Sequence, residues 1–98
     1  MAGQIRITPE ELRATAKFVM SKEQAINSEI QALKAKIQET ENNWEGAAQN
    51  SFVETFNQML PMLEQQLPQV LEGIQQMLYG TAVTMEETDQ QIASAFRG

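Results

Sequence analysis

Two long runs of regularly spaced apolar residues, separated by a short break, organise this chain of 98 residues. In the first run the repeated positions lie alternately four and three residues apart, the spacing of a helix that packs lengthwise against another helix. These positions, here called the first seam, are Leu12, Ala16, Val19, Glu23, Ile26, Ile30, Leu33, Ile37, Thr40 and Trp44. Glu23 and Thr40 are its polar exceptions, and we predict that they fix the register of packing.

A helix start precedes the first seam. Thr8 is a favourable N-cap, Pro9 suits the first helical position, and Glu11 lies three residues after the cap, where its carboxylate completes a capping box. We therefore predict a helix over about residues 8–41.

The second run keeps the same spacing without a polar interruption and predicts another helix over about residues 49–80. This second seam consists of Val53, Phe56, Leu60, Leu63, Leu67, Val70, Ile74 and Met77. Pro61 and Pro68 each follow a seam residue directly. We expect both rings on the solvent side of one bent helix, not a division into two helices.

The break between the runs covers about residues 42–48 and contains Trp44 and Gly46. Glycine reaches a positive φ at little cost, so we expect the chain to reverse at Gly46. We expect Trp44 to leave water at the end of the bundle while its indole N–H finds an acceptor. From these residues alone the segment is interpreted as a structural corner, with a recognition signal as the alternative.

After Gly80 the sequence becomes polar, and residues 81–98 are predicted to form a helical or flexible tail. Within it, Met85, Asp89, Ile92 and Phe96 keep a helical spacing of four, three and four. The tail is interpreted either as the last part of the apolar stripe of the bundle or as a peptide that binds a partner.

The predicted fold is all-α, a single domain over residues 1–98 in which two antiparallel helices form a hairpin. Apolar residues flank the second seam on both sides, so its stripe is wider than one neighbouring helix can cover. We therefore predict that two hairpins pair as a dimer and form a four-helix bundle, with an identical copy or with a similar chain. The predicted hairpin or dimer core comprises Leu12, Val19, Ile26, Ile30, Leu33, Ile37, Phe56, Leu60, Leu63, Leu67, Val70 and Ile74.

The chain lacks the residues on which most catalytic and metal sites depend. It contains no histidine and no cysteine, which removes the usual nucleophile and base pairs and the usual zinc ligands. The paired acids Glu10-Glu11 and Glu86-Glu87 are sequence neighbours, so they do not converge on one site along a helix. We predict a protein without enzymatic activity, cofactor or metal.

The formal net charge of −6 comes from the second half of the chain, where Arg97 is the only base in residues 45–98. An acidic protein repels nucleic acid and anionic lipid, so neither is expected as a partner. No apolar run approaches the roughly 20 residues of a membrane span, and the first residues lack the apolar core of a signal peptide. Stable membrane insertion is not expected, and export would require a dedicated machine.

The length, the hairpin pattern and the central Trp44-Glu45-Gly46 together resemble the WXG family, the ESAT-like small substrates of type VII secretion in Gram-positive bacteria and mycobacteria. The resemblance covers the whole chain. It points to the Bacillus-type branch through five segments: Met1-Ala2-Gly3, Ile5-Arg6, residues 8–13, residues 88–93 and Arg97-Gly98.

The resemblance implies export as a folded hairpin dimer by a membrane machine that is driven by an FtsK/SpoIIIE-type ATPase. Trp44 and Gly46 match the turn motif of the family. A C-terminal secretion signal in its broader hydrophobic form is matched by Met85, Asp89, Ile92 and Phe96. The common form, a tyrosine followed four residues later by an acid, is absent because Val83 follows Tyr79 at that distance. The chain therefore carries the broader signal or travels with a partner that supplies one.

The leading functional hypothesis is a non-enzymatic type VII substrate that is secreted without a cleaved signal peptide and acts in virulence or signalling after export. The alternative is an intracellular coiled-coil adaptor or a secretion chaperone for a partner substrate. A third hypothesis is a membrane-perturbing effector, which the acidity of the chain opposes at neutral pH.

Overall fold

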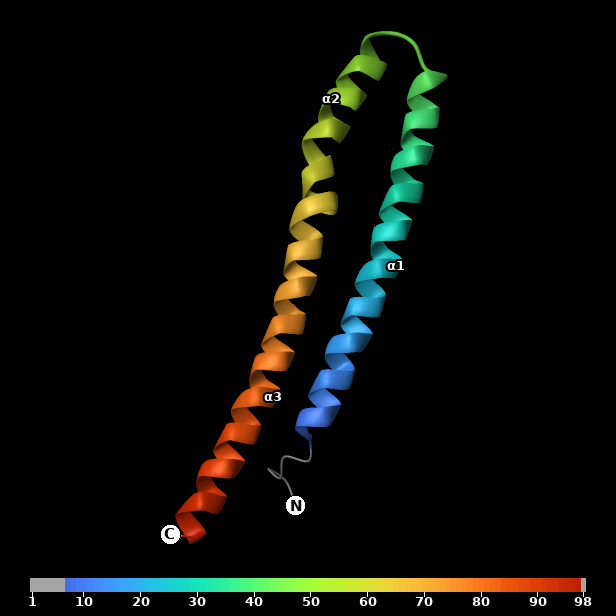
Figure 1. The fold of residues 1–98 in the computed structure, drawn as a ribbon. Coiled ribbons are helices and arrows are strands. Elements are labelled where there is room, and N and C mark those ends of the chain that lie inside the picture. The colour runs from blue at the N-terminus through green and yellow to red at the C-terminus, as the bar shows by residue number, and fades with distance from the viewer. Residues whose placement is uncertain (1–6, 98) are drawn as a thin grey trace, which may run out of the picture.

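Two long helical arms run antiparallel and meet at a short turn (Figure 1). The computed structural model describes residues 7–97. The first arm is α1 (Pro9–Asn42), and the second consists of α2 (Ala47–Pro61), the π-helical turn η1 (Met62–Gln66) and α3 (Leu67–Arg97). The predicted all-α hairpin is confirmed. The expectations that concern residues 1–6 and Gly98 lie outside the described residues.

The start of α1 has the geometry that its sequence predicts. The Glu11 amide donates to Thr8 Oγ1 at 3.1 Å, and the Thr8 amide donates to Glu11 Oε2 at 3.3 Å. Pro9 lies in the first helical turn, where its missing N–H removes no hydrogen bond. The capping box and the proline therefore fix where α1 begins.

The second arm follows one continuous helical path past both prolines (Figure 1). In η1 the Leu67 amide donates to the Met62 carbonyl, five residues back instead of four, so this turn holds one additional residue. Pro68 follows directly, and because it has no N–H it fits where the hydrogen-bond pattern returns to the α-helical spacing. The helix then continues through Gly80, so residues 81–97 are helical.

The additional residue in η1 changes which side chains of the second arm face α1. Up to the start of α3, the members of the second seam are half-buried, as predicted: Val53, Phe56 and Leu60 in α2, Leu63 in η1, and Leu67 at the first position of α3. After Leu67, the positions that face α1 are Leu71, Gln75, Leu78 and Ala82, one residue later than the seam requires. Val70 and Ile74, expected in the core, are 59% and 40% exposed in the single chain. They lie outside the hairpin core, and their place in a dimer core stays a prediction.

The two prolines also differ in exposure. Pro61 is exposed, as expected for the solvent side of the helix. Pro68 is half-buried, because it follows η1 and shares the rotated face.

α1 packs closely on α3 and separates from α2 toward the turn (Figure 1). Ala16 and Ala82 are 1% and 0% exposed, and small side chains at such points allow two helices to approach closely. Leu12 and Ile30, both predicted in the core, are buried as well. α2 has no buried residue. Leu33, also predicted in the core, is 49% exposed, and the next residue, Lys34, faces the second arm instead, where it contacts Glu64.

The two polar members of the first seam behave differently. Gln75 Nε2 donates to Glu23 Oε1 at 2.6 Å, so Glu23 faces α3 and helps to set the alignment of the arms. Thr40 donates its hydroxyl to the Lys36 carbonyl of its own helix and is exposed, so it does not fix the register.

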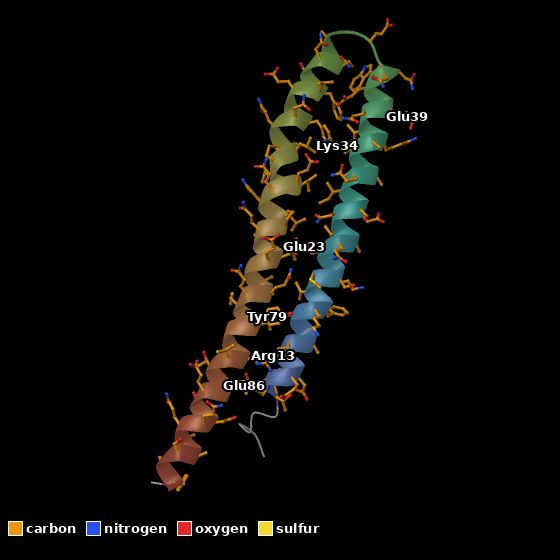
Figure 2. The ribbon with its side chains drawn as sticks, viewed as in Figure 1. Arg13, Glu23, Lys34, Glu39, Tyr79 and Glu86 are labelled. Carbon is orange, nitrogen blue, oxygen red and sulfur yellow. The ribbon has the colours of Figure 1, made fainter. Side chains whose placement is uncertain are left out.

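Two ion pairs join the arms on either side of the Glu23 contact (Figure 2). Gln31 and Lys34 donate to Glu64 Oε2 at 3.0 and 3.3 Å, and Arg13 donates to Glu86. The hydrogen bonds from Gln31 and Lys34 hold the pKa of Glu64 below its ordinary value of 4.5, and the bond from Arg13 does the same for the pKa of Glu86. Because the pairs lie at the surface, they specify alignment more than they add stability.

Candidate functional site

The turn between the arms is closed by main-chain hydrogen bonds and one glycine. The amides of Asn43 and Trp44 donate to the carbonyls of Thr40 and Glu41, each at 3.2 Å, and end α1. Gly46 then has φ 112° and ψ 179°, a region that only glycine occupies at low cost. It is the only residue with a positive φ within 7–97, and the expected reversal at Gly46 is confirmed.

Trp44 begins a row of aromatic rings at the tip of the hairpin. Its ring centroid lies 5.5 Å from that of Phe52, at an angle of 48° between the planes. Phe52 in turn stacks on Phe56 with a centroid distance of 6.3 Å and an angle of 3°. Trp44 is 37% exposed, so it does not leave water in the single chain as expected. The reason is the separation of the arms at this end, where α1 and α2 do not close over the ring.

The four predicted signal residues share one face at the end of α3. Met85 is half-buried and Asp89 is exposed, while Ile92 and Phe96 are 52% and 88% exposed. Glu86 pairs with Arg13 near the start of α1, and α3 then extends past this start as residues 87–97 (Figure 1). This segment, here called the overhang, presents its apolar side chains on a helix that is already formed.

The turn and the overhang lie at opposite ends of a molecule that is 77 Å long (Figure 1). Trp44 and Gly46 therefore cannot form one site with Ile92 and Phe96 of the same chain. Any site that combines them requires a second chain.

The described residues carry exposed contact surfaces at both ends of the hairpin. Among residues 7–97 there is no group of three histidine, cysteine, aspartate or glutamate side chains arranged to hold a metal ion. None of the helices in this part of the chain is both long enough and apolar enough to cross a membrane. Exposed aromatic and aliphatic side chains, which both the turn and the overhang carry, are typical of surfaces that bind other proteins.

The family model WXG100, described as proteins of 100 residues with WXG, matches residues 4–90. This chain belongs to the WXG100 family. Among solved structures it is similar to Geobacillus thermodenitrificans EsxA (crystal form I), a Bacillus-type WXG protein, with 33% sequence identity and a TM-score of 0.70. The match covers 93% of this chain and 98% of that one. A comparison with proteins of curated function finds no match.

Membership of the WXG100 family and the EsxA-like fold support the assignment of a small type VII secretion substrate. The WXG tripeptide, residues 44–46 here, supplies both features of the turn: Trp44 begins the aromatic row, and Gly46 provides the reversal. The expectations of an all-helical hairpin and of a Bacillus-type WXG protein are thereby confirmed.

Sequence reasoning missed the cross-helix contacts that align this WXG100 protein. Lys34 with Glu64 and Arg13 with Glu86 are pairs of opposite charge, and both pairs are centred near residue 49, several residues after the turn. A search for charge pairs symmetric about the Trp44–Gly46 segment would have found neither, because the offset between the arms is set by the tertiary structure. Nor would it have found the stacking of Phe52 on Trp44, which depends on how the arms diverge.

Proposed function

We propose that this WXG100 protein is a non-enzymatic substrate of a Gram-positive type VII secretion system, exported as a folded dimer without a cleaved signal peptide. The observation that carries the proposal is the overhang, where Ile92 and Phe96 are exposed in helical register with Asp89. An amphipathic helix of this kind can enter a groove on another protein without any unfolding of the hairpin. Its partner is the FtsK/SpoIIIE-type ATPase of the secretion machine.

A dimer also gives the turn motif a role. In an antiparallel pair of hairpins, the overhang of one chain lies beside Trp44 and Gly46 of the other, although the two features are at opposite ends of each chain. The half-exposed rings of Trp44 and Phe52 would then lose contact with water to the partner helix. Turn and overhang together would form a signal that only the folded dimer displays.

The test is export from a native producer, measured as protein in the culture supernatant with a cytoplasmic lysis marker as reference. Deletion of residues 85–98, or Trp44→Arg, is expected to abolish export and leave soluble protein in the cells. Because the deletion also removes Glu86 and its bond to Arg13, the sharper variant is Ile92→Ser with Phe96→Ser, which changes two exposed side chains. Gln91→Ser with Ala95→Ser, also exposed and on the same helix, is the matched control.

The outcomes separate the two functional hypotheses. Loss of export in the Ile92 and Phe96 variant, with normal export of the control, supports the signal assignment. Normal export of both contradicts it. If the unchanged protein stays inside the cell, the intracellular adaptor or chaperone is the better description.

A further inference from the structure

The overhang continues, past the start of α1, the row of side chains with which α3 faces α1. Within the hairpin this row includes the fully buried Ala82 and the half-buried Met85. The same spacing of three and four residues leads on to Asp89, Ile92 and Phe96, here called the overhang row. None of the described residues covers Phe96, which is 88% exposed. The overhang row is thus an extension of the packed face of α3 that α1 is too short to reach.

The start of α1 lies beside the overhang (Figure 1). Arg13 pairs with Glu86, and Pro9 is four residues before Arg13. In two antiparallel helices, Pro9 is therefore level with about residue 90 of α3. Thr8 has φ −108° and ψ 159°, so the chain reaches α1 in an extended conformation. The sequence that precedes α1 consequently joins it next to the overhang row.

That preceding sequence matches the overhang row in spacing and polarity. An extended conformation, continued from Thr8, places Ile5 and Ile7 on the same side, about 7 Å apart. Ile92 and Phe96 are four residues apart on a helix, which is about 6 Å along its axis. Ile7 is 43% exposed and Ile92 is 52% exposed. Two apolar side chains before α1 can therefore cover two apolar side chains of the overhang.

Charge and attachment favour this segment over a separate molecule. Arg6, between the two isoleucines, is the only charged residue before Glu10, and it is opposite in sign to the exposed Asp89 of the overhang row. The long side chain of Arg6 can reach Asp89 along the edge of an apolar contact. A second copy would instead bring a net charge of −6. Because the segment is tethered beside the overhang, its effective concentration there is of the order of millimolar.

We propose that the segment Ile5–Ile7 covers the overhang row of its own chain, with Ile7 on Ile92, Ile5 on Phe96 and Arg6 near Asp89. The contact is autoinhibitory, because the segment hides the overhang row from the secretion ATPase and must leave before the row enters a groove on that protein. It leaves the other sides of the overhang free for the turn of a second copy. The inference rests on the proposed function, since it concerns the regulation of the same signal residues.

Disulfide trapping tests the contact, because the chain contains no cysteine of its own. The variant Ile5→Cys with Phe96→Cys is compared with Ile5→Cys with Ser94→Cys, whose second thiol is two residues away on the opposite side of the same helix. Both proteins are oxidised with oxidised glutathione at nanomolar concentration, and the internal disulfide is followed by mass spectrometry. We expect the bond to position 96 to form at least tenfold faster than the bond to position 94.

The other outcomes overturn the proposal and leave the proposed function to its own test. Equal rates would show that the segment does not rest on the overhang row. A covalent dimer in place of the internal disulfide would show that a second copy covers the row. In both cases the export of the Ile92→Ser and Phe96→Ser variant still decides the signal assignment separately. If the internal disulfide forms as expected but that variant is exported normally, the row is not the signal, and the autoinhibitory role is wrong together with the proposed function.

A charge exchange provides a second measurement on the same disulfide between positions 5 and 96. Arg6→Asp is expected to slow its formation at least threefold, because two acids then face each other. Adding Asp89→Arg is expected to restore the rate, whereas adding Gln91→Arg, on the opposite side of the helix, is not. Equal effects of the two added bases would contradict the contact between Arg6 and Asp89.

Discussion

The half of the hairpin where α1 meets α3 and the half where α1 meets α2 use the same seam spacing but pack differently. In the first, Ala16 and Ala82 are almost completely buried and the helices lie close together. In the second, the side chains at the tip are aromatic, no residue of α2 is buried, and the arms diverge (Figure 1). Seam spacing places residues on a common face, but the size of the side chains decides how closely two helices approach.

It follows that the stability of a single chain is concentrated in the half near the termini. The tip, with its half-exposed Trp44 and Phe52, is the part that would gain most from a second chain in the proposed dimer. The boundary between the halves is η1, and the predictions below begin there.

Deletion of one residue is expected to destabilise the protein much less in η1 than in α3. Without Gln66, η1 can become α-helical while α3 keeps its orientation, so we expect a change of no more than about 1 kcal/mol in the free energy of unfolding. Without Gln76, the rest of α3 turns by about 100° and carries Leu78 and Ala82 away from α1, at a cost of roughly 3 kcal/mol or more. Urea unfolding at one fixed protein concentration measures both. Equal losses would show that η1 does not absorb an additional residue.

Replacing an alanine by leucine is expected to lower the stability of the protein only where α1 packs closely on α3. Ala82→Leu forces a larger side chain between α1 and α3 and should destabilise the protein by about 1–3 kcal/mol. Ala48→Leu, at an exposed position of α2, should change stability by less than about 0.5 kcal/mol. Thermal and urea unfolding of the pair measure the difference. A similar loss at both positions would mean that the tip is packed as tightly as the α1–α3 contact.

The reversal at the tip depends on glycine alone. Gly46→Ala places a Cβ on a backbone with φ 112°, although no atom lies within 4 Å of that Cβ. The cost is therefore backbone strain and not a clash, and we expect at least about 1 kcal/mol of lost stability. Glu45→Ala, next to it, is the control, since no residue other than glycine has a positive φ in the described part. Unchanged stability of the glycine variant would indicate that the turn can adopt another conformation.

The smallest expected effect is the loss of stability in acid, which arises from the ion pairs that align the arms. The pKa values of Glu64 and Glu86 are lowered by folding from an ordinary 4.5, so both groups add stability above that pH and lose it as the pH falls through the lower folded values. The double variant Glu64→Gln and Glu86→Gln should be slightly less stable than the unchanged protein at pH 7, with the difference disappearing by about pH 3. Glu54→Gln, an exposed acid of α2, is the control for the loss of a charge. A difference that persists at pH 3 would contradict the ionic origin of the effect.

The sequence by itself determined the two helical arms, the start of α1 and the turn between the arms. Thr8 and Glu11 specify the start of α1, Gly46 specifies the turn, and the spacing of the seams specifies two long helices, because capping, backbone conformation and periodicity are local properties. The WXG tripeptide and the tail pattern were equally readable, since the first is three consecutive residues and the second lies on one helix.

Only the tertiary structure decided which apolar residues are covered. Val70 and Leu71 are neighbours and both apolar, so no local rule selects between them, and the choice depends on η1 and on the contacts of Glu64 and Gln75 with α1. The exposure of Trp44 was likewise set by the distance between the arms and not by its own preference for burial. In both cases the deciding quantity is the relation between two distant segments, which spacing along one segment does not contain.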